Sequence, residues 1–368
     1  MTPKTDLRAE AGRLMAFFEA AGAVPVEADI LQPAEILLDL YGEDIRARAY
    51  VTSDPLRGEQ MLRPDFTVPV VQMHMADGAE PARYTYAGEV FRKQEDYSDR
   101  ASEYLQVGYE VFDRENPAAA DAEVFALFNE VLAPHGLRAA TGDIGILMAA
   151  VRGLSTTERR KEALLRHLWR PRRFRALLDR FGGRVAASKP RQKLLKLLET
   201  NSVDLLVSDA GAQIGLRGAD EIATRLRVIK ADAQEPPISA GEVELLDTIM
   251  SLRETAPNAL QHLRDIAVDL PEVQPAVRTM AKRLEALDAR GIDVDALEFE
   301  GNHGRTTLEY YDGFVFGFSA PMRPDLPPIA TGGRYDALTR VLGQGRSIPA
   351  VGGVIRPELL RRVLEASE

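Results

Sequence analysis

The spacing of apolar residues near the start of the chain predicts an amphipathic helix over residues 6–21. Apolar side chains recur there every three or four positions, the interval that places them on one helix face. They are Leu7, Ala11, Leu14, Met15 and Phe18. Gly22 follows directly and is a suitable residue to end the helix.

Strand-like patterns follow in the first half of the chain. Residues 48–52 alternate between apolar and polar side chains, and residues 83–91 and 103–112 are rich in residues that favour strands. The polar segment 92–102 joins the last two runs. This connection predicts an antiparallel pair rather than a strand–helix–strand unit.

The middle of the chain has a helical pattern. Leucines recur at helical spacing over residues 159–196, where basic residues far outnumber Glu162 and Asp179. This basic segment is either a solvated helical face or a docking surface for a partner. Further helices are predicted over residues 219–231, 240–253 and 273–289.

Strand patterns return near the end of the chain, over residues 294–300 and 307–318. Residues 330–364 are predicted to form a glycine-rich turn, a helix, a strand and a helix. An order of strands, then helices, then strands predicts an α+β protein with a helical insertion in one sheet domain. The expected division is a core of residues 1–145 and 246–368 and an insertion of residues 146–245.

The composition narrows the classes of function. The chain has 368 residues, no cysteine and a formal net charge of −10. The lack of cysteine excludes disulfides, thiolate metal sites and cysteine nucleophiles. Its acidity argues against tRNA or DNA as the main partner, because gripping a long nucleic acid usually needs a basic surface. With no apolar run long enough for a membrane span and no secretory signal, we expect a cytoplasmic protein without a metal or cofactor.

Two polar segments predict a site for a small cationic ligand. Asp65 and Thr67 lie two residues apart and would face the same way on an extended chain, where both can accept from one ammonium group. Gln106, Gly108 and Glu110 would share one face of a strand. An amide, a gap without a side chain and a carboxylate suit a cationic ligand that lies across a sheet.

Each feature also has an ordinary explanation. Asp65 is compatible with a surface turn, and Glu110 with a solvent-facing strand position. Tyr310 and Tyr311 would point to opposite faces of a strand, so at least one of them is expected in the core. The Gly-Gly-Arg run at residues 332–334 is compatible with a tight turn that binds nothing.

In this order the segments resemble the catalytic domain of histidyl-tRNA synthetase, a class II aminoacyl-tRNA synthetase. Residues 62–67 resemble its amino-acid-binding loop, and residues 91–110 resemble its motif 2. Residues 308–316 and 332–336 resemble its two histidine-specific signatures. The resemblance implies an α+β fold with an antiparallel sheet flanked by helices. It covers residues 5–145 and 290–360.

The resemblance also implies a histidine-binding site. Asp65, Thr67 and Gln106 would hold the ammonium group, and Glu110 and Tyr311 would hold the imidazole. Histidine offers an ammonium group and a ring N–H as donors, and these residues offer acceptors for both.

Two more residues complete the expected site. Arg92 would face the carboxylate or an activated phosphate, and Tyr310 would support the pocket. The full expected set is Asp65, Thr67, Arg92, Gln106, Glu110, Tyr310 and Tyr311.

Departures from the synthetase pattern imply that the activation chemistry is lost. Thr306 stands where the synthetase has an arginine that stabilises adenylation, and Arg305 is one residue away. Leu359 falls where the motif 3 arginine is expected, with Arg356 offset from it, and Asp29 replaces the motif 1 proline. Without both arginines the site lacks cations to neutralise the phosphates of ATP. Because the sequence ends shortly after motif 3, we also expect no anticodon-binding domain.

A retained amino-acid pocket without activation residues resembles the ATP phosphoribosyltransferase regulatory subunits, a family related to the synthetase. That resemblance implies a non-catalytic dimer that forms a hetero-oligomer with the short-form catalytic subunit. The dimer would activate that subunit and take part in histidine feedback at the first step of histidine biosynthesis. Histidine is then the expected ligand, and neither tRNA nor a membrane is an expected partner.

Other functions stay compatible with the residues. An active synthetase, or an amino-acid ligase on the same fold, would use Arg92 for ATP, with Arg305 or Arg356 in place of the lost groups. Either enzyme requires pyrophosphate exchange with some amino acid. A stand-alone histidine sensor would bind histidine without affecting any phosphoribosyltransferase.

Overall fold

The computed structural model describes residues 4–34, 47–94, 101–211, 215–305 and 310–365. The chain divides into two compact units. The first comprises Met1–Ala150 and Thr248–Glu368, and the second Val151–Asp247. The insertion expected over residues 146–245 stays a prediction, because compactness alone does not show that a segment folds independently.

A nine-stranded sheet runs through the described residues of the first unit, in the order β1-β5-β6-β12-β11-β10-β7-β9-β8. The strands are β1 (Val24–Pro25), β5 (Ala82–Phe91), β6 (Glu103–Phe112), β7 (Arg138–Asp143), β8 (Arg253–Thr255), β9 (Glu298–Glu300), β10 (Phe314–Ser319), β11 (Ala330–Arg334) and β12 (Ala350–Ile355). Neighbouring strands from β5 to β7 are antiparallel, whereas β1 and β9 join the sheet in parallel. A mostly antiparallel sheet with helices confirms the α+β prediction.

The pair β5 and β6 confirms the antiparallel pair predicted from the sequence. In its register Gly88 lies opposite Gln106, and Tyr86 lies opposite Gly108. Residues that pair directly place their side chains on the same face. Gln106, Gly108 and Glu110 therefore share one face of the sheet with Tyr86.

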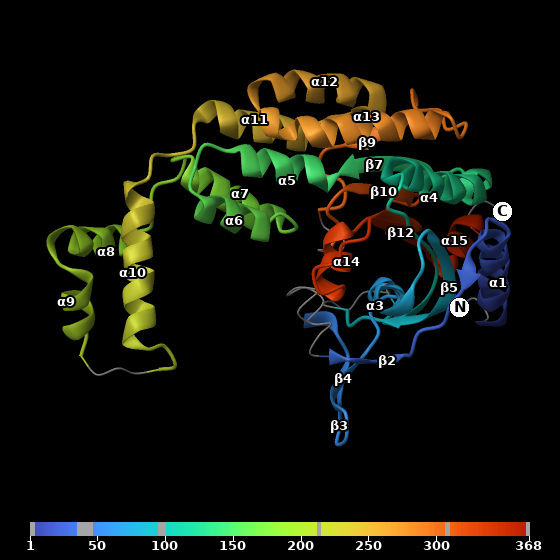
Figure 1. Ribbon diagram of the computed structural model, residues 1–368, viewed down its shortest axis with the longest axis horizontal. Coiled ribbons are helices and arrows are strands. Elements are labelled where there is room, and N and C mark those ends of the chain that lie inside the picture. The colour runs from blue at the N-terminus through green and yellow to red at the C-terminus, as the bar shows by residue number, and fades with distance from the viewer. Residues whose placement is uncertain (1–3, 35–46, 95–100, 212–214, 306–309, 366–368) are drawn as a thin grey trace. The chain divides into compact units, whose positions relative to one another are not determined.

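Helices flank this sheet, and the predicted N-terminal helix is among them. They are α1 (Lys4–Ala20), α4 (Pro117–Leu132), α12 (Ala256–Asp269), α13 (Gln274–Asp288) and α15 (Pro357–Leu364). Leu14 and Phe18 of α1 are fully buried. Figure 1 shows α12 alongside α13, and α1 alongside α15. A separate small sheet, β2 (Leu31–Pro33), β4 (Gly58–Leu62) and β3 (Val51–Asp54), precedes the loop that carries Asp65.

The described part of the second unit contains helices and no strand. They are α6 (Glu158–Arg166), α7 (Pro171–Phe181), α8 (Lys189–Thr200), α9 (Val203–Ser208) and α10 (Ala219–Gln234), so the helical pattern of residues 159–196 is confirmed. α5 (Ile144–Gly153) and α11 (Ala240–Ser251) each cross a boundary between the units.

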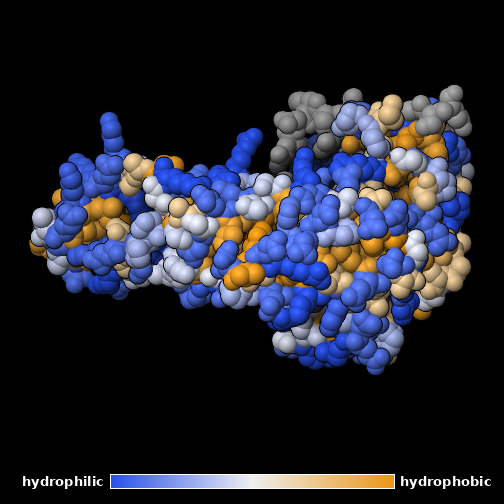
Figure 2. Space-filling view, turned by 90° about the horizontal axis from the view of Figure 1, so that it is seen from above, coloured by the Kyte–Doolittle hydropathy of each residue, from blue (hydrophilic) through white to orange (hydrophobic). Residues whose placement is uncertain are grey.

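Figure 2 shows hydrophilic residues over most of the visible surface, with smaller groups of hydrophobic residues between them.

Two predictions for the last part of the chain are wrong. The strand expected over residues 307–318 begins at Phe314, and Tyr310 to Gly313 lie outside it. Part of that range, residues 307–309, lies outside the described residues. The expected glycine-rich turn is strand β11. A Cβ on Gly332 would lie 2.2 Å from the Phe316 ring, so this glycine permits close packing within the sheet rather than a turn.

A buried ionic network joins four elements of the first unit. Asp121 of α4 is fully buried and accepts from Arg334 at 2.7 Å and from Arg283 at 3.1 Å. Arg283 also contacts Asp143 of β7 at 2.6 Å. Removing one partner of such a pair leaves a buried charge uncompensated. The arginine of the Gly-Gly-Arg run therefore has a structural role.

Candidate functional site

A buried carboxylate lies at the centre of the candidate site. Glu110 is on β6 and only 1% of its surface is exposed, which contradicts a solvent-facing position. Its Oε1 accepts from the hydroxyls of Thr67 at 3.0 Å and Tyr86 at 2.8 Å. Its Oε2 accepts from the Tyr335 hydroxyl at 2.6 Å. Three neutral donors from three different segments thus fix the carboxylate in one orientation.

Two glycines make room for this arrangement. A Cβ on Gly352 of the neighbouring strand would lie 1.5 Å from Glu110 Oε2. A Cβ on Gly108 would lie 2.1 Å from the Tyr86 ring. Both distances are far below any van der Waals contact, so the carboxylate and the phenol lie across the sheet only because these positions carry no side chain.

The environment of Glu110 favours its neutral form. Burial raises the pKa of Glu110 to about 7, although its hydrogen bonds from Tyr335, Tyr86 and Thr67 oppose that rise. The nearby charge of Asp65 raises this pKa further. No ion pair joins Glu110 to a cation within the described residues. A ligand that brings a positive charge or an N–H donor to this carboxylate would stabilise its ionised form.

The loop before Thr67 brings a second carboxylate to the site. Asp65 has an exposed fraction of 2%, which contradicts the surface-turn explanation. Its Oδ2 lies 3.5 Å from the Tyr310 hydroxyl. Arg63 holds the loop by donating to the backbone carbonyls of Glu89, at 2.8 Å, and of Ala28. Thr67 then begins helix α3 (Thr67–Asp77).

Gln106 provides an unused acceptor in the sheet. Its side chain is 1% exposed, and no partner among the described residues donates to its Oε1. Gly88 is paired with it, and a Cβ there would meet Arg63 and Phe66. Gln106 therefore lies on the face of the sheet that the loop covers, where an ammonium group can donate to its oxygen.

The tyrosine pair belongs to the same site. Tyr310 and Tyr311 are both buried, and their ring centroids are 5.0 Å apart. The argument that they alternate between faces was wrong, because neither residue lies in a strand. Burial raises the pKa of Tyr311, and the charges of Glu110 and Asp65 raise it further. Tyr311 is therefore a protonated phenol within electrostatic reach of both carboxylates.

Two arginines adjoin the candidate site, Arg92 beside the loop that carries Asp65 and Arg356 near the tyrosine pair. Arg92 donates from Nε to the Pro64 carbonyl at 2.8 Å. Arg356, at the end of β12, donates to the Pro328 carbonyl at 2.8 Å. Burial lowers the pKa of Arg356, and the nearby positive charge of Arg92 lowers it too. A negatively charged group placed between these guanidiniums would relieve that repulsion.

Sequence reasoning missed two residues of the site, Tyr86 and Tyr335. The position of Tyr86 opposite Gly108 follows from the strand register, which one sequence alone does not reveal. Tyr335 lies in the recognised signature, directly before α14 (Asp336–Leu342). Asp312 fixes the start of that helix by accepting from the backbone N–H groups of Asp336 and Ala337, and burial raises its pKa to about 6.

Comparison with known proteins identifies the family. The model of the histidyl-tRNA synthetase family matches residues 4–235 and 223–360. An ATP phosphoribosyltransferase regulatory subunit of Agrobacterium fabrum is 31% identical over 370 residues, which cover 95% of each chain. One from Mesorhizobium japonicum is 30% identical and covers 97% of this chain and 98% of its own. The chain belongs to the histidyl-tRNA synthetase-like family of ATP phosphoribosyltransferase regulatory subunits.

Solved structures confirm the class II synthetase-like fold of this family member. A Bacillus halodurans protein described as an ATP phosphoribosyltransferase regulatory subunit/histidyl-tRNA synthetase superposes with a TM-score of 0.67 at 20% identity, covering 98% of this chain and 79% of its own. Histidyl-tRNA synthetase from Nostoc gives 0.65 at 17% identity, covering 99% and 73%. In the part of the chain that the structure describes, no helix is long and apolar enough to cross a membrane.

Proposed function

We propose that this protein is a non-catalytic regulatory subunit that binds histidine at the Glu110 site. It activates the short-form ATP phosphoribosyltransferase catalytic subunit and relays histidine feedback at the first step of histidine biosynthesis. The names of its relatives support the partner. The observation that supports the ligand is a buried carboxylate that three hydroxyls hold, with no cation paired to it among the described residues.

The donors and acceptors of the site match histidine group by group. Glu110 accepts from the imidazole N–H, with Tyr311 beside it. The Thr67 hydroxyl already donates to Glu110, so its lone pairs stay available to accept from the ammonium group. Gln106 Oε1 and Asp65 supply further acceptors for that group. Arg92 faces the α-carboxylate.

Regulation requires that histidine has different affinities for two states of the complex. The protein self-associates as a dimer and forms a cytoplasmic hetero-oligomer with the catalytic subunit. Histidine bound near Tyr335 and Thr67 contacts α14 and α3 at their first turns, so those helices are the elements through which binding reaches the surface. This account involves no tRNA.

One observation favours a second candidate function, an amino-acid ligase or histidine-activating enzyme. Arg92 and Arg356 lie within electrostatic range of each other. Tyr310 and Tyr311 lie within electrostatic range of Arg356. Two such cations can bind phosphate as well as carboxylate. The two positions where the synthetase has an arginine add no cation that the structure describes. Leu359 lies on α15 and offers no charge, and Thr306 lies outside the described residues.

Pyrophosphate exchange separates the two functions. The regulatory account predicts no incorporation of labelled pyrophosphate into ATP with histidine or any other amino acid. Exchange with any amino acid would establish an activating enzyme and overturn the non-catalytic proposal. An authentic histidyl-tRNA synthetase in parallel shows that the assay detects activation.

A further inference from the structure

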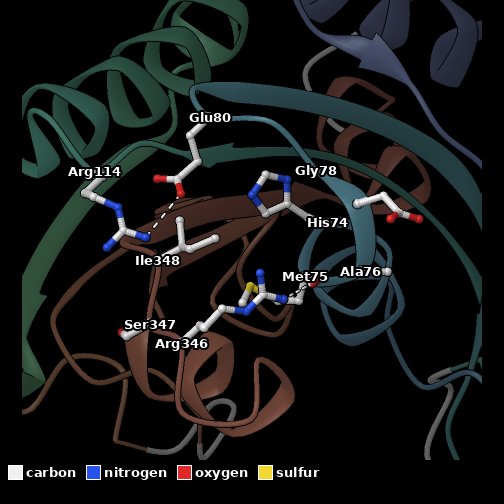
Figure 3. A pocket seen from close by; sticks show the side chains of 10 residues that line it. His74, Met75, Ala76, Gly78, Glu80, Arg114, Arg346, Ser347 and Ile348 are labelled. Carbon is white, nitrogen blue, oxygen red and sulfur yellow. Dashed lines mark hydrogen bonds and ion pairs between the residues drawn. The ribbon is translucent and has the colours of Figure 1, made fainter.

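A cavity lies in the first unit, beside the C-terminal end of α3 and the segment that joins α14 to β12. Its volume is about 450 Å³, within the range of small-molecule sites. Figure 3 shows the side chains of His74, Glu80, Arg114 and Arg346 around it. None of the seven candidate histidine-binding residues lines this cavity. It is therefore distinct from the Glu110 site.

His74 contributes an unsatisfied polar atom to the cavity wall. Its side chain is buried, and its ring stacks on Phe112 with centroids 4.0 Å apart. Nδ1 lies 3.1 Å from the Tyr84 hydroxyl, whereas Nε2 has no partner among the described residues. Burial lowers the pKa of His74, so the neutral ring carries one proton. When Tyr84 donates to Nδ1, that proton is on Nε2.

The two arginines that line the cavity, Arg114 and Arg346, have different partners. Arg114 contacts Glu80 at 3.1 Å. Arg346 donates from Nη2 to the Met75 carbonyl at 2.6 Å, and no ion pair joins it to a carboxylate in the described part of the chain. Arg346 thus keeps most of its N–H donors for a ligand. Asp77 is the remaining charged residue of the lining.

We propose that this cavity binds a compact anion, a carboxylate or phosphoryl group on a small molecule, through Arg346 and the Nε2–H of His74. The planar fork of a guanidinium matches either group. Two cations and two carboxylates leave the lining close to neutral. This balance disfavours a polyphosphate and favours an anion of one or two charges.

The cavity shares helix α3 with the Glu110 site and lies near β6 and α14. Helix α3 begins at Thr67 and carries His74 in its last turn. Strand β6 carries Glu110 and ends at Phe112, on which His74 stacks. Helix α14 begins just after Tyr335 and leads into the loop that carries Arg346. An anion in the cavity would therefore lie against the last turn of the helix that begins at Thr67.

Equilibrium dialysis of the full-length chain with radiolabelled inorganic phosphate, with acetate as competitor, tests this site. We expect saturable binding that Arg346→Gln weakens about tenfold or more. The matched control is Arg340→Gln, which removes the same charge from an exposed arginine of α14 outside the cavity. Phosphate binding that acetate does not displace assigns a phosphoryl group. Displacement by acetate at lower concentrations than unlabelled phosphate requires assigns a carboxylate.

A second variant tests the imidazole. His74→Phe keeps an aromatic ring on Phe112 and removes both nitrogens, so we expect weaker binding of the same anion, with thermal unfolding as the check on folding. Absence of saturable binding at millimolar anion would overturn the proposal. Equal losses in Arg346→Gln and Arg340→Gln would do the same, because they indicate nonspecific attraction. Neither outcome depends on histidine binding, so each differs from a failure of the Glu110 site.

Discussion

At the residue scale, the buried Glu110 differs from the buried carboxylates of the ionic network. Asp121 is equally buried, but two arginines neutralise it. In the described part of the chain Glu110 receives only neutral hydroxyl donors, and burial raises its pKa to about 7. A buried carboxylate without a cation destabilises the empty protein when it ionises. A ligand that brings a positive charge or an N–H donor would stabilise the ionised form.

Glu110→Ala is predicted to weaken histidine binding by roughly 1.5–3 kcal/mol, because the variant loses a charge-assisted acceptor. Isothermal titration calorimetry measures the change. The matched control is Glu103→Ala at the exposed start of the same strand, which we expect to bind like the wild type. Unchanged affinity in Glu110→Ala would remove this residue from the site.

The ionisation of Glu110 also predicts how stability depends on pH. Between pH 4.5, the ordinary pKa, and about pH 7, the unfolded chain releases a proton that the folded chain keeps. The free energy of unfolding should therefore fall by roughly 3 kcal/mol across this window, and the loss should persist at higher pH.

Urea unfolding of Glu110→Gln checks that prediction. The amide does not ionise, so the variant should gain stability relative to the wild type as the pH rises through the window. Glu103→Gln serves as the control and should keep the wild-type dependence. Identical pH slopes in wild type and Glu110→Gln would contradict the pKa of this buried carboxylate.

At the scale of elements, the packing of β6 against β12 shapes the pocket. Their register places Gly352 opposite Glu110, and no side chain fits there. Gly352→Ala should abolish measurable histidine binding and cost about 1–3 kcal/mol of stability through overpacking. The comparison is Gly12→Ala on the exposed face of α1, where a Cβ meets nothing within 4 Å.

Calorimetry and thermal unfolding separate these two effects. Gly12→Ala should bind histidine normally and gain roughly 0.5–1 kcal/mol, since alanine favours the helix. A Gly352→Ala protein that is folded and binds histidine like the wild type would show that the ligand does not approach Glu110.

Elements that local sequence patterns determine could be predicted, whereas elements that depend on long-range contacts could not. The helix at residues 6–21 and the pair of residues 83–91 and 103–112 were predictable because local periodicity determines them. The start of β10 and the strand at Gly332 were not, because they depend on pairing between distant segments, β10 with β7 and β11. Gly332 also packs closely against Phe316. The roles of Tyr86 and Tyr335 depend likewise on contacts with Glu110 from distant segments.

At the scale of the whole molecule, the net charge is negative, but residues 159–196 form a basic helical segment. Part of that positive charge is neutralised within the second unit itself, since Arg160 and Arg191 both contact Asp232. Arg175 and Arg184 likewise share Asp247. These pairs support a structural role for part of the segment. The exposed Arg172, Arg173, Lys193 and Lys196 remain for solvent or a partner.

The central claim is that this chain regulates a phosphoribosyltransferase in response to histidine. The most direct measurement is phosphoribosyl-ATP formation by a short-form catalytic subunit from the same organism, with and without this chain, across a histidine titration. The account predicts stimulation by the chain and suppression by histidine, with suppression shifted to higher histidine concentrations in Glu110→Ala. A catalytic subunit whose rate is the same with and without the chain would contradict it.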